Sequence, residues 1–229
     1  MKKLCPLFFA REDTNFLRHY SLLCYNFHNN CDFFRTFTVA MILDIHTHNT
    51  QTHAQTIEAV GIHPWRALVG SLAEVELQAP AADAIGEVGL DYACDVPREV
   101  QMEVFRAQLA LAERLEKPVV LHCVRAFEDV MKVVGEYHLR AVIFHGFIGS
   151  TEQAQRAVEQ GYYLSFGERT FRSSKTIAAL RSTPLSHLFV ETDESTTPIE
   201  EIYAKIARLK GVEVRELLQA TEANFKRIF

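Results

Sequence analysis

The sequence of 229 residues lacks an apolar run long enough to cross a membrane, which excludes a membrane-spanning helix. It has few cysteines, odd in number and without a CxxC pair: Cys5, Cys24, Cys31, Cys94 and Cys123. Neither a disulfide framework nor a zinc knuckle is indicated, so we expect a reducing cytoplasm as the location. Excess positive charge is also missing. The formal net charge of −5 excludes a protein that coats nucleic acid by bulk electrostatics, but not an enzyme whose bound cations meet phosphates.

Residues 1–40 show neither the helical nor the alternating apolar pattern of the remaining chain. A short apolar run near their start resembles a signal peptide, but charged residues follow at once and no small-residue cleavage site is present. Met41 stands immediately before the first expected strand. We therefore expect residues 1–40 to be a poorly ordered or non-native extension and residues 41–229 to form the functional domain.

From Met41 onward, short apolar segments rich in β-branched residues alternate with amphipathic helical stretches. The expected strands are Ile42–His46, Glu58–Ile62, Ala84–Val88, Pro118–His122, Ala141–His145, Tyr162–Phe166 and His187–Glu191. The expected helices cover residues 97–116, 126–137, 151–160, 174–181, 198–210 and 214–228. This alternation predicts an α/β fold, a small TIM-like (β/α) barrel of seven strands. A doubly wound open sheet is the alternative, but no glycine-rich phosphate loop follows the first expected strand.

Histidines and acidic residues stand at the carboxyl ends of strand after strand. The set comprises His46, His48, His63, Glu87, His122, His145 and Asp193. Any one of them has an ordinary explanation, such as a hydrogen-bonded core histidine. Together they predict a metal site, because imidazole and carboxylate groups bind divalent cations and the carboxyl ends of barrel strands form the active site.

The stretches that carry these residues occur in a fixed order along the chain. They are Asp44-Ile-His-Thr-His48, Gly61-Ile-His-Pro64, Ile85-Gly-Glu-Val-Gly-Leu-Asp-Tyr92, Pro118-Val-Val-Leu-His122, His145-Gly-Phe-Ile-Gly149 and Glu191-Thr-Asp193, with Asn224 near the end. This series resembles the TatD family of metal-dependent deoxyribonucleases, which have amidohydrolase-like barrels. The resemblance implies that residues 41–229 form a metal-dependent hydrolase barrel.

The resemblance also implies two divalent metal ions, which would be zinc, manganese or magnesium. One ion would be held by His46, His48 and Asp193, and the other by His122 and His145, with Glu87 bridging the two. Four imidazole ligands favour zinc or manganese over magnesium alone.

The expected activity is cleavage of DNA phosphodiester bonds through a metal-activated water. Asp193 is the expected general base, beside the bridging Glu87. His63 would contact a phosphate or protonate the leaving group, although a turn-stabilising role is equally compatible with its position. We expect flanking phosphates to be bound by arginines, namely Arg125, Arg169 and Arg172.

Two other functions remain open. The same scaffold could cleave a carboxylic ester or amide, or the chain could be a vestigial metal-binding relative without nuclease activity. The complete set of ligands argues against the vestigial relative. We expect no membrane association and no obligate protein partner.

The sequence departs from the family pattern around the expected substrate. Family members usually have several dozen residues between the first two motifs, whereas only Asn49 to Val60 intervene here, so we expect the second β/α unit to be missing. Trp65 stands where a second histidine is often found, and Val124 where an arginine is usual. Glu194 begins the pair that replaces the usual Ala-Pro after Asp193.

Overall fold

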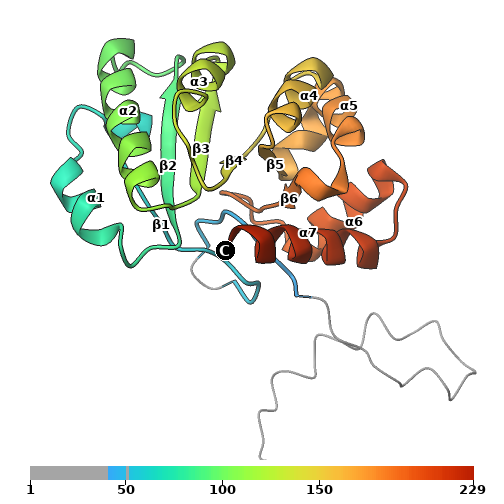
Figure 1. Ribbon diagram of the computed structural model, residues 1–229. Coiled ribbons are helices and arrows are strands. Elements are labelled where there is room, and N and C mark those ends of the chain that lie inside the picture. Colours follow the sequence, from blue (N-terminus) through green and yellow to red (C-terminus); the bar gives the residue numbers. More distant parts are fainter. Residues whose placement is uncertain (1–40, 50–51) are drawn as a thin grey trace, which may run out of the picture. The chain divides into compact units, whose positions relative to one another are not determined.

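Residues 41–49 and 52–229 are described in the computed structural model of the chain, and the prediction for residues 1–40 lies outside them. A single sheet of six parallel strands runs in sequence order: β1 Ala59–Val60, β2 Ala84–Asp91, β3 Val119–Val124, β4 Val142–Phe144, β5 Tyr163–Phe166 and β6 Leu188–Val190. The helices lie outside the strands (Figure 1): α1 Leu72–Gln78, α2 Arg98–Arg114, α3 Phe127–Val134, α4 Thr151–Glu159, α5 Ser174–Ser182, α6 Ile199–Lys210 and α7 Val214–Ile228. Short 3₁₀ turns are η2 Pro64–Arg66, η3 Glu168–Arg172 and η4 Leu185–His187. The predicted α/β class with a TIM-like parallel sheet is confirmed.

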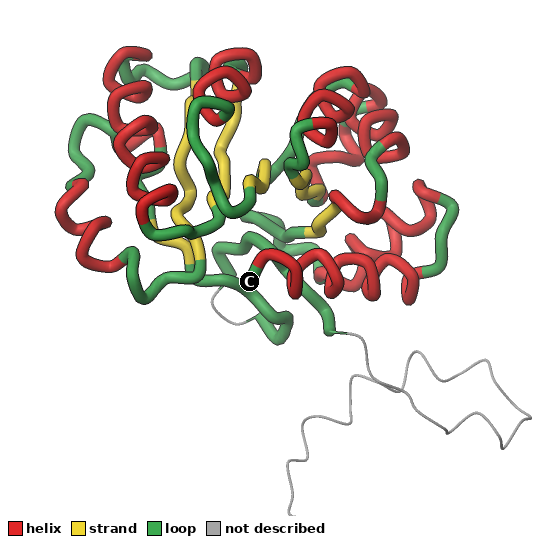
Figure 2. Tube along the Cα trace, in the orientation of Figure 1, coloured by secondary structure: helices red, strands yellow, loops and turns green. Residues whose placement is uncertain are grey.

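The first expected strand, Ile42–His46, is not a regular strand and appears as loop in Figure 2, which leaves six strands where seven were expected. Leu43 forms an isolated parallel bridge with Gln55, and the Ile45 N–H donates to the Val190 carbonyl at 3.1 Å. Because Gln55 leads directly into β1, this segment still connects β6 to β1 by hydrogen bonds. Among the described residues no longer ladder forms here, because the short connection between His48 and β1 supplies few partner residues.

Side chains of β4, β5 and β6 alternate between two apolar clusters, as strands buried on both faces require. In β4, for example, Phe144 belongs to the cluster that includes the helices, whereas Ile143 belongs to a smaller cluster with Phe189 of β6 and Ile228 of α7. Arg140, just before β4, donates to the Ile228 carbonyl at 2.6 Å. The end of α7 therefore lies at the amino ends of the strands, and the carboxyl ends remain for the site.

Local signals explain where several helices begin and end. Ser150 and Gln153 form a reciprocal capping box at the start of α4, and α6 ends at Gly211, whose φ of 70° suits glycine. Helix α1 was not among the expected helices. It has seven residues and exposes apolar groups such as Leu77, which is 82% exposed, so no clear apolar stripe marks it. Among the described residues, no helix is long and apolar enough to span a membrane.

Candidate metal centre

The segment from His46 to His48 is fixed to Asp193 by backbone hydrogen bonds. The His48 N–H donates to the Asp193 carbonyl at 3.1 Å, and the Asp193 N–H donates to the His46 carbonyl at 3.0 Å. Asp193 itself has a φ of 53°, a left-handed conformation that aspartate tolerates better than most residues. The two bonds hold all three side chains at one point: Asp193 Oδ1 lies 3.8 Å from His46 Nε2 and 3.6 Å from His48 Nε2.

The buried carboxylate of Asp44 further stabilises the contact between the His46–His48 segment and Asp193. Asp44 accepts hydrogen bonds from the Thr192 N–H at 2.8 Å and from the Thr192 hydroxyl at 2.7 Å. The Thr192 hydroxyl also lies 2.7 Å from the Thr47 hydroxyl. Burial raises the pKa of Asp44, and the hydrogen bonds from Thr192 oppose that effect. Asp44 was not among the expected site residues, although it begins the motif that contains His46 and His48.

Glu87 lies at the centre of the histidines. Its Oε1 is 3.2 Å from His46 Nε2 and 3.4 Å from His48 Nε2. Its Oε2 is 2.8 Å from His145 Nε2 and 3.6 Å from His122 Nδ1. Each carboxylate oxygen therefore faces a different pair of imidazoles. The six expected ligands lie close together, although β2 runs on to Asp91 and Glu87 therefore lies in the middle of its strand and not at the carboxyl end. Three groups of side chains could hold a metal ion, one of which includes His63, which was not an expected ligand: His46, His145 and Asp193; His46, His48 and Glu87; His63, Glu87 and His122.

The charges in the cluster balance one another. Burial alone would raise the pKa of Glu87, but the close contacts of its carboxylate with His122, His145 and His46 outweigh burial and hold that pKa well below the usual range. Burial would also lower the pKa of His46, but the neighbouring carboxylates raise it to about 9. The carboxylates around His46 therefore attract positive charge to this part of the cluster. His46 Nε2 is buried and has no hydrogen-bond partner.

Two further carboxylates lie behind the second pair of histidines. Asp91 Oδ2 is 3.2 Å from His122 Nε2, which directs Nδ1 of the same ring towards Glu87. Glu191 Oε1 is 3.9 Å from His145 Nδ1 and accepts the Gly146 N–H at 2.5 Å. Burial raises the pKa of Glu191 to about 8. Asp91 and Glu191 both belong to the sequence motifs described above, but neither was among the expected site residues.

His63 lies at the edge of the cluster, with Nε2 3.8 Å from Glu87 Oε2. Its Nδ1 accepts the backbone N–H of Trp65 at 3.2 Å, so in the neutral ring the proton is on Nε2. Burial and the neighbouring His122 lower the pKa of His63 to about 4. The geometry is compatible with both roles predicted for His63. Its Nδ1 stabilises a turn, and its Nε2 points at the cluster.

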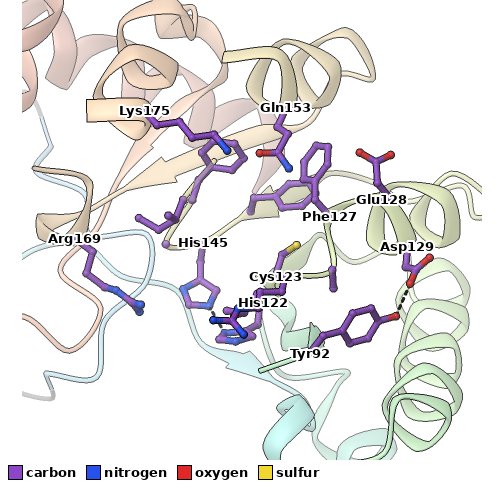
Figure 3. A pocket seen from close by; sticks show the side chains of 17 residues that line it. Tyr92, His122, Cys123, Phe127, Glu128, Asp129, His145, Gln153, Arg169 and Lys175 are labelled. Atoms are coloured by element: carbon purple, nitrogen blue, oxygen red, sulfur yellow. Dashed lines mark hydrogen bonds between the residues drawn. The ribbon is translucent and has the colours of Figure 1, made fainter. Parts of the chain in front are cut away.

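The expected arginines line cavities beside the cluster. A cavity of about 540 Å³, which we term the cationic pocket, is lined by His122 and His145 and by three cationic side chains, Arg125, Arg169 and Lys175. Two acids also line it, Asp129 and Glu128, of which Glu128 pairs with Arg156. Figure 3 shows Arg169 and Lys175 on the side of this pocket opposite Tyr92 and Asp129, whose side chains share a hydrogen bond of 2.6 Å.

A neighbouring cavity of about 570 Å³ contains Arg169, Arg172 and Asp193. All three expected arginines therefore lie near the candidate ligands. Lys175 was missed, because a lysine in the first turn of an amphipathic helix, here α5, looks like any solvated surface residue.

Known proteins resemble this chain in sequence and fold. A sequence model of a family described as "TatD related DNase" matches residues 34–229. YabD of Bacillus subtilis (strain 168), named as an uncharacterized metal-dependent hydrolase, is 37% identical over 164 residues, covering 64% of this chain and 64% of YabD. Mouse TATDN3, named as a candidate deoxyribonuclease, is 31% identical over 162 residues, covering 64% of this chain and 55% of TATDN3. The crystal structure of YjjV, a TatD homolog from Escherichia coli K12, has a TM-score of 0.70 at 30% identity over 76% of each chain. This chain thus spans about 64% of the length of YabD and 55% of that of TATDN3.

Proposed function

The chain belongs to the TatD family, as its motifs predicted, and on that premise we propose that it is a divalent-metal-dependent hydrolase that cleaves phosphodiester bonds in DNA. One observation carries the proposal. The two oxygens of Glu87 face two different pairs of imidazoles, at 2.8 to 3.6 Å, beside a pocket with three cationic side chains. A carboxylate between two histidine pairs suits two cations, and the cationic pocket suits the phosphates of a nucleic acid.

The donor set fits two divalent cations. His46 Nε2 is buried without a hydrogen-bond partner, and the carboxylates around it attract positive charge, which raises the pKa of His46. We propose that His46, His48 and Asp193 hold one cation, that His122 and His145 hold the other, and that Glu87 binds both. Four imidazoles favour zinc or manganese over magnesium alone. When bound, the two cations would supply Lewis-acid activation of water and neutralise charge on the phosphate.

Proton transfer is assigned to Asp193. Of the two carboxylates in the expected ligand set, Glu87 is a weak proton acceptor because its pKa is held well below the usual range, so Asp193 is the proposed base. Asp91 and Glu191 lie behind the histidines and are only 3% and 1% exposed, which keeps them from a bound water. His63 takes another role. With a pKa of about 4 its imidazole is neutral at pH 7, and a neutral imidazole is too weak an acid to protonate a leaving group. Its Nε2–H can instead donate a hydrogen bond to a phosphate oxygen.

The cationic side chains are assigned to the phosphates on either side of the scissile bond. Arg125 and Lys175 line the cationic pocket, Arg172 lines the neighbouring cavity, and Arg169 lines both. Arg125, Arg169 and Lys175 share a cavity with His122 and His145, so a phosphodiester chain that crosses the cluster towards His145 would meet their positive charges. A neutral carboxylic ester would form no ion pair with these groups. We therefore propose a phosphodiester and not a carboxylic ester as the substrate.

The test compares substrates and metals in one experiment. Metal-stripped protein is loaded with zinc, manganese or magnesium and assayed on a labelled single-stranded oligonucleotide and on a panel of carboxylic esters. We expect cleavage of the oligonucleotide with at least one metal. Hydrolysis of an ester without cleavage of DNA would overturn the proposal in favour of a carboxyl substrate, and metal binding without either activity would indicate a vestigial relative.

Charge variants make the assay more specific. Replacing Arg169 or Lys175 by glutamine should weaken oligonucleotide binding. Each substitution should also reduce the slope of log binding constant against log salt concentration by about 1, the value for one phosphate contact. Lys226→Gln is the matched control, since Lys226 is 65% exposed and pairs with Glu222 on α7. Equal effects of all three variants would show that the cationic pocket does not bind the substrate.

We further propose a cytoplasmic location. Within the described residues both cysteines, Cys94 and Cys123, are free thiols. Free thiols are typical of reducing compartments, which supports this location.

A further inference from the structure

Trp65 places an exposed aromatic ring directly beside the candidate metal centre. It is the single tryptophan of the chain, and 60% of its surface is exposed. The centroid of its ring lies 4.8 Å from that of His63 and 6.2 Å from that of His122, both in edge-to-face geometry. Isolated apolar groups are common on protein surfaces and need no function. The surroundings of Trp65 distinguish it from that background.

The indole is anchored along one edge. Its Nε1–H donates to Asp91 Oδ2 at 2.6 Å, and Asp91 is only 3% exposed. The backbone N–H of Trp65 donates to His63 Nδ1 at 3.2 Å, which fixes the turn that carries the ring. The polar edge of the indole is held in this way, while 60% of the residue's surface stays exposed to solvent. Little side-chain freedom remains to be lost when a ligand stacks on it.

We infer that Trp65 is a stacking platform for a nucleobase next to the scissile phosphate. This inference rests on the proposed function, because it names the part of a DNA substrate that meets the ring. Within one nucleotide a single sugar separates base from phosphate. The ring centroid of Trp65 lies 4.8 Å from that of His63, whose Nε2 is 3.8 Å from Glu87 Oε2. It lies 6.2 Å from the ring centroid of His122, a proposed metal ligand. A base on the indole would therefore place its phosphate at the cluster.

The platform defines a substrate class. Stacking needs a base that has left its duplex neighbours, so the ring selects single-stranded DNA or a frayed end. It also accepts every base, since each has a π face, and so predicts little sequence preference. Loss of one stacked base typically weakens binding by roughly 5- to 150-fold, and that range is the effect expected on removing the ring.

The single tryptophan makes the inference directly measurable. The full chain, loaded with metal, is titrated with a single-stranded phosphorothioate oligonucleotide while tryptophan emission is recorded. A second oligonucleotide of equal length and charge carries abasic sites. We expect saturable quenching by the first oligonucleotide and little by the second. Equal signals from both, or no quenching despite binding, would overturn the inference.

KM measurements on variants distinguish base stacking by Trp65 from a structural role, in which the indole would act only by holding Asp91 in place. Trp65→Ala should raise KM for the base-bearing oligonucleotide by roughly 5- to 150-fold and leave KM for the abasic one nearly unchanged. Trp65→Phe keeps an aromatic face but lacks the N–H, so it should retain most of the affinity. Leu77→Ala on α1 is the control, since Leu77 is 82% exposed and has no such anchor.

The possible failures are distinct. Equal losses in Trp65→Phe and Trp65→Ala on both oligonucleotides would show that the indole acts only by holding Asp91, which overturns the platform. Wild-type protein that cleaves DNA equally well with and without bases would also overturn it, while leaving the proposed function intact. If the wild type cleaves no DNA, the proposed function fails. The quenching experiment needs no catalysis, so it still decides whether the ring binds bases.

Discussion

Replacing Glu87 by glutamine tests the two-cation proposal most directly. The substitution keeps the shape of the side chain but removes the one charge that faces both pairs of imidazoles, with Oε1 3.2 Å from His46 and Oε2 2.8 Å from His145. At an effective dielectric constant of about 20, two unit charges about 4 Å apart interact by about 4 kcal/mol. The histidines, Asp193 and the amide oxygen of glutamine remain as ligands, so only part of this interaction energy should be lost. We expect the metal Kd to increase by about 100-fold.

This loss can be read as a thermal shift. At a free metal concentration of about 100 times its Kd, each bound cation stabilises the wild type by about 2.7 kcal/mol. A domain of this size gains about 2–4 °C in Tm per kcal/mol, so each bound cation should raise the Tm of the wild type by about 5–10 °C. In Glu87→Gln the same concentration equals the new Kd, and the rise should shrink to about 1–2 °C.

The assay is differential scanning fluorimetry over a metal titration, with metal content measured by plasma mass spectrometry. Glu136→Gln serves as the control, since Glu136 pairs with Arg106 on the surface at 2.5 Å and lies outside the cluster. A Glu87→Gln variant with the same metal content and the same metal-induced shift as the wild type would refute the bridging role. The two-cation proposal would then lose its main support.

Three other outcomes follow from the same geometry. Asp193→Asn should lower turnover by roughly 10²–10⁴ without recovery at high metal concentration, because it removes the proposed base; full recovery in a metal-titrated rate assay would make Asp193 a ligand only. Asp44→Ala leaves the buried Thr192 donors without an acceptor and should destabilise the fold by about 1–3 kcal/mol in urea unfolding, whereas the exposed Asp95→Ala should not. Residues 41–229 produced alone should keep the Tm and metal content of the full chain, and a large drop in Tm would contradict the expectation for residues 1–40.

Much of the candidate site could be predicted because the information is local. A parallel strand has one carboxyl end, and a histidine or acid there points to the same rim as its counterparts on other strands. His122 and His145 needed only a strand assignment to be placed together, and the structure brings Nδ1 of one within 3.2 Å of Nε2 of the other. Glu87 was also expected among them, since an isolated buried acid is costly, although its strand is longer than expected and places Glu87 in mid-strand.

Contacts between distant segments could not be predicted in this way. Trp65 and Asp91 are separated by 26 positions, and nothing in either local pattern indicates that the indole N–H meets that carboxylate. The expected first strand failed for a related reason. Apolar residues such as Leu43 and Ile45 have strand character, but a regular ladder also needs partner residues, and Gln55 provides a single bridge. Whether partners exist depends on the fold, not on the segment itself.

The connection between the first segment and β6 also explains how the site persists without a full second β/α unit. His46 and His48 are positioned by hydrogen bonds to Asp193, and Asp44 is held by Thr192. Every one of these contacts lies on the β6 side of the segment, whereas the shortened connection lies on the β1 side. Loss of a β/α unit there removes ladder partners but none of the bonds that orient the ligands. The candidate ligands His46 and His48 are therefore positioned from the β6 side, by bonds that do not involve the short connection to β1.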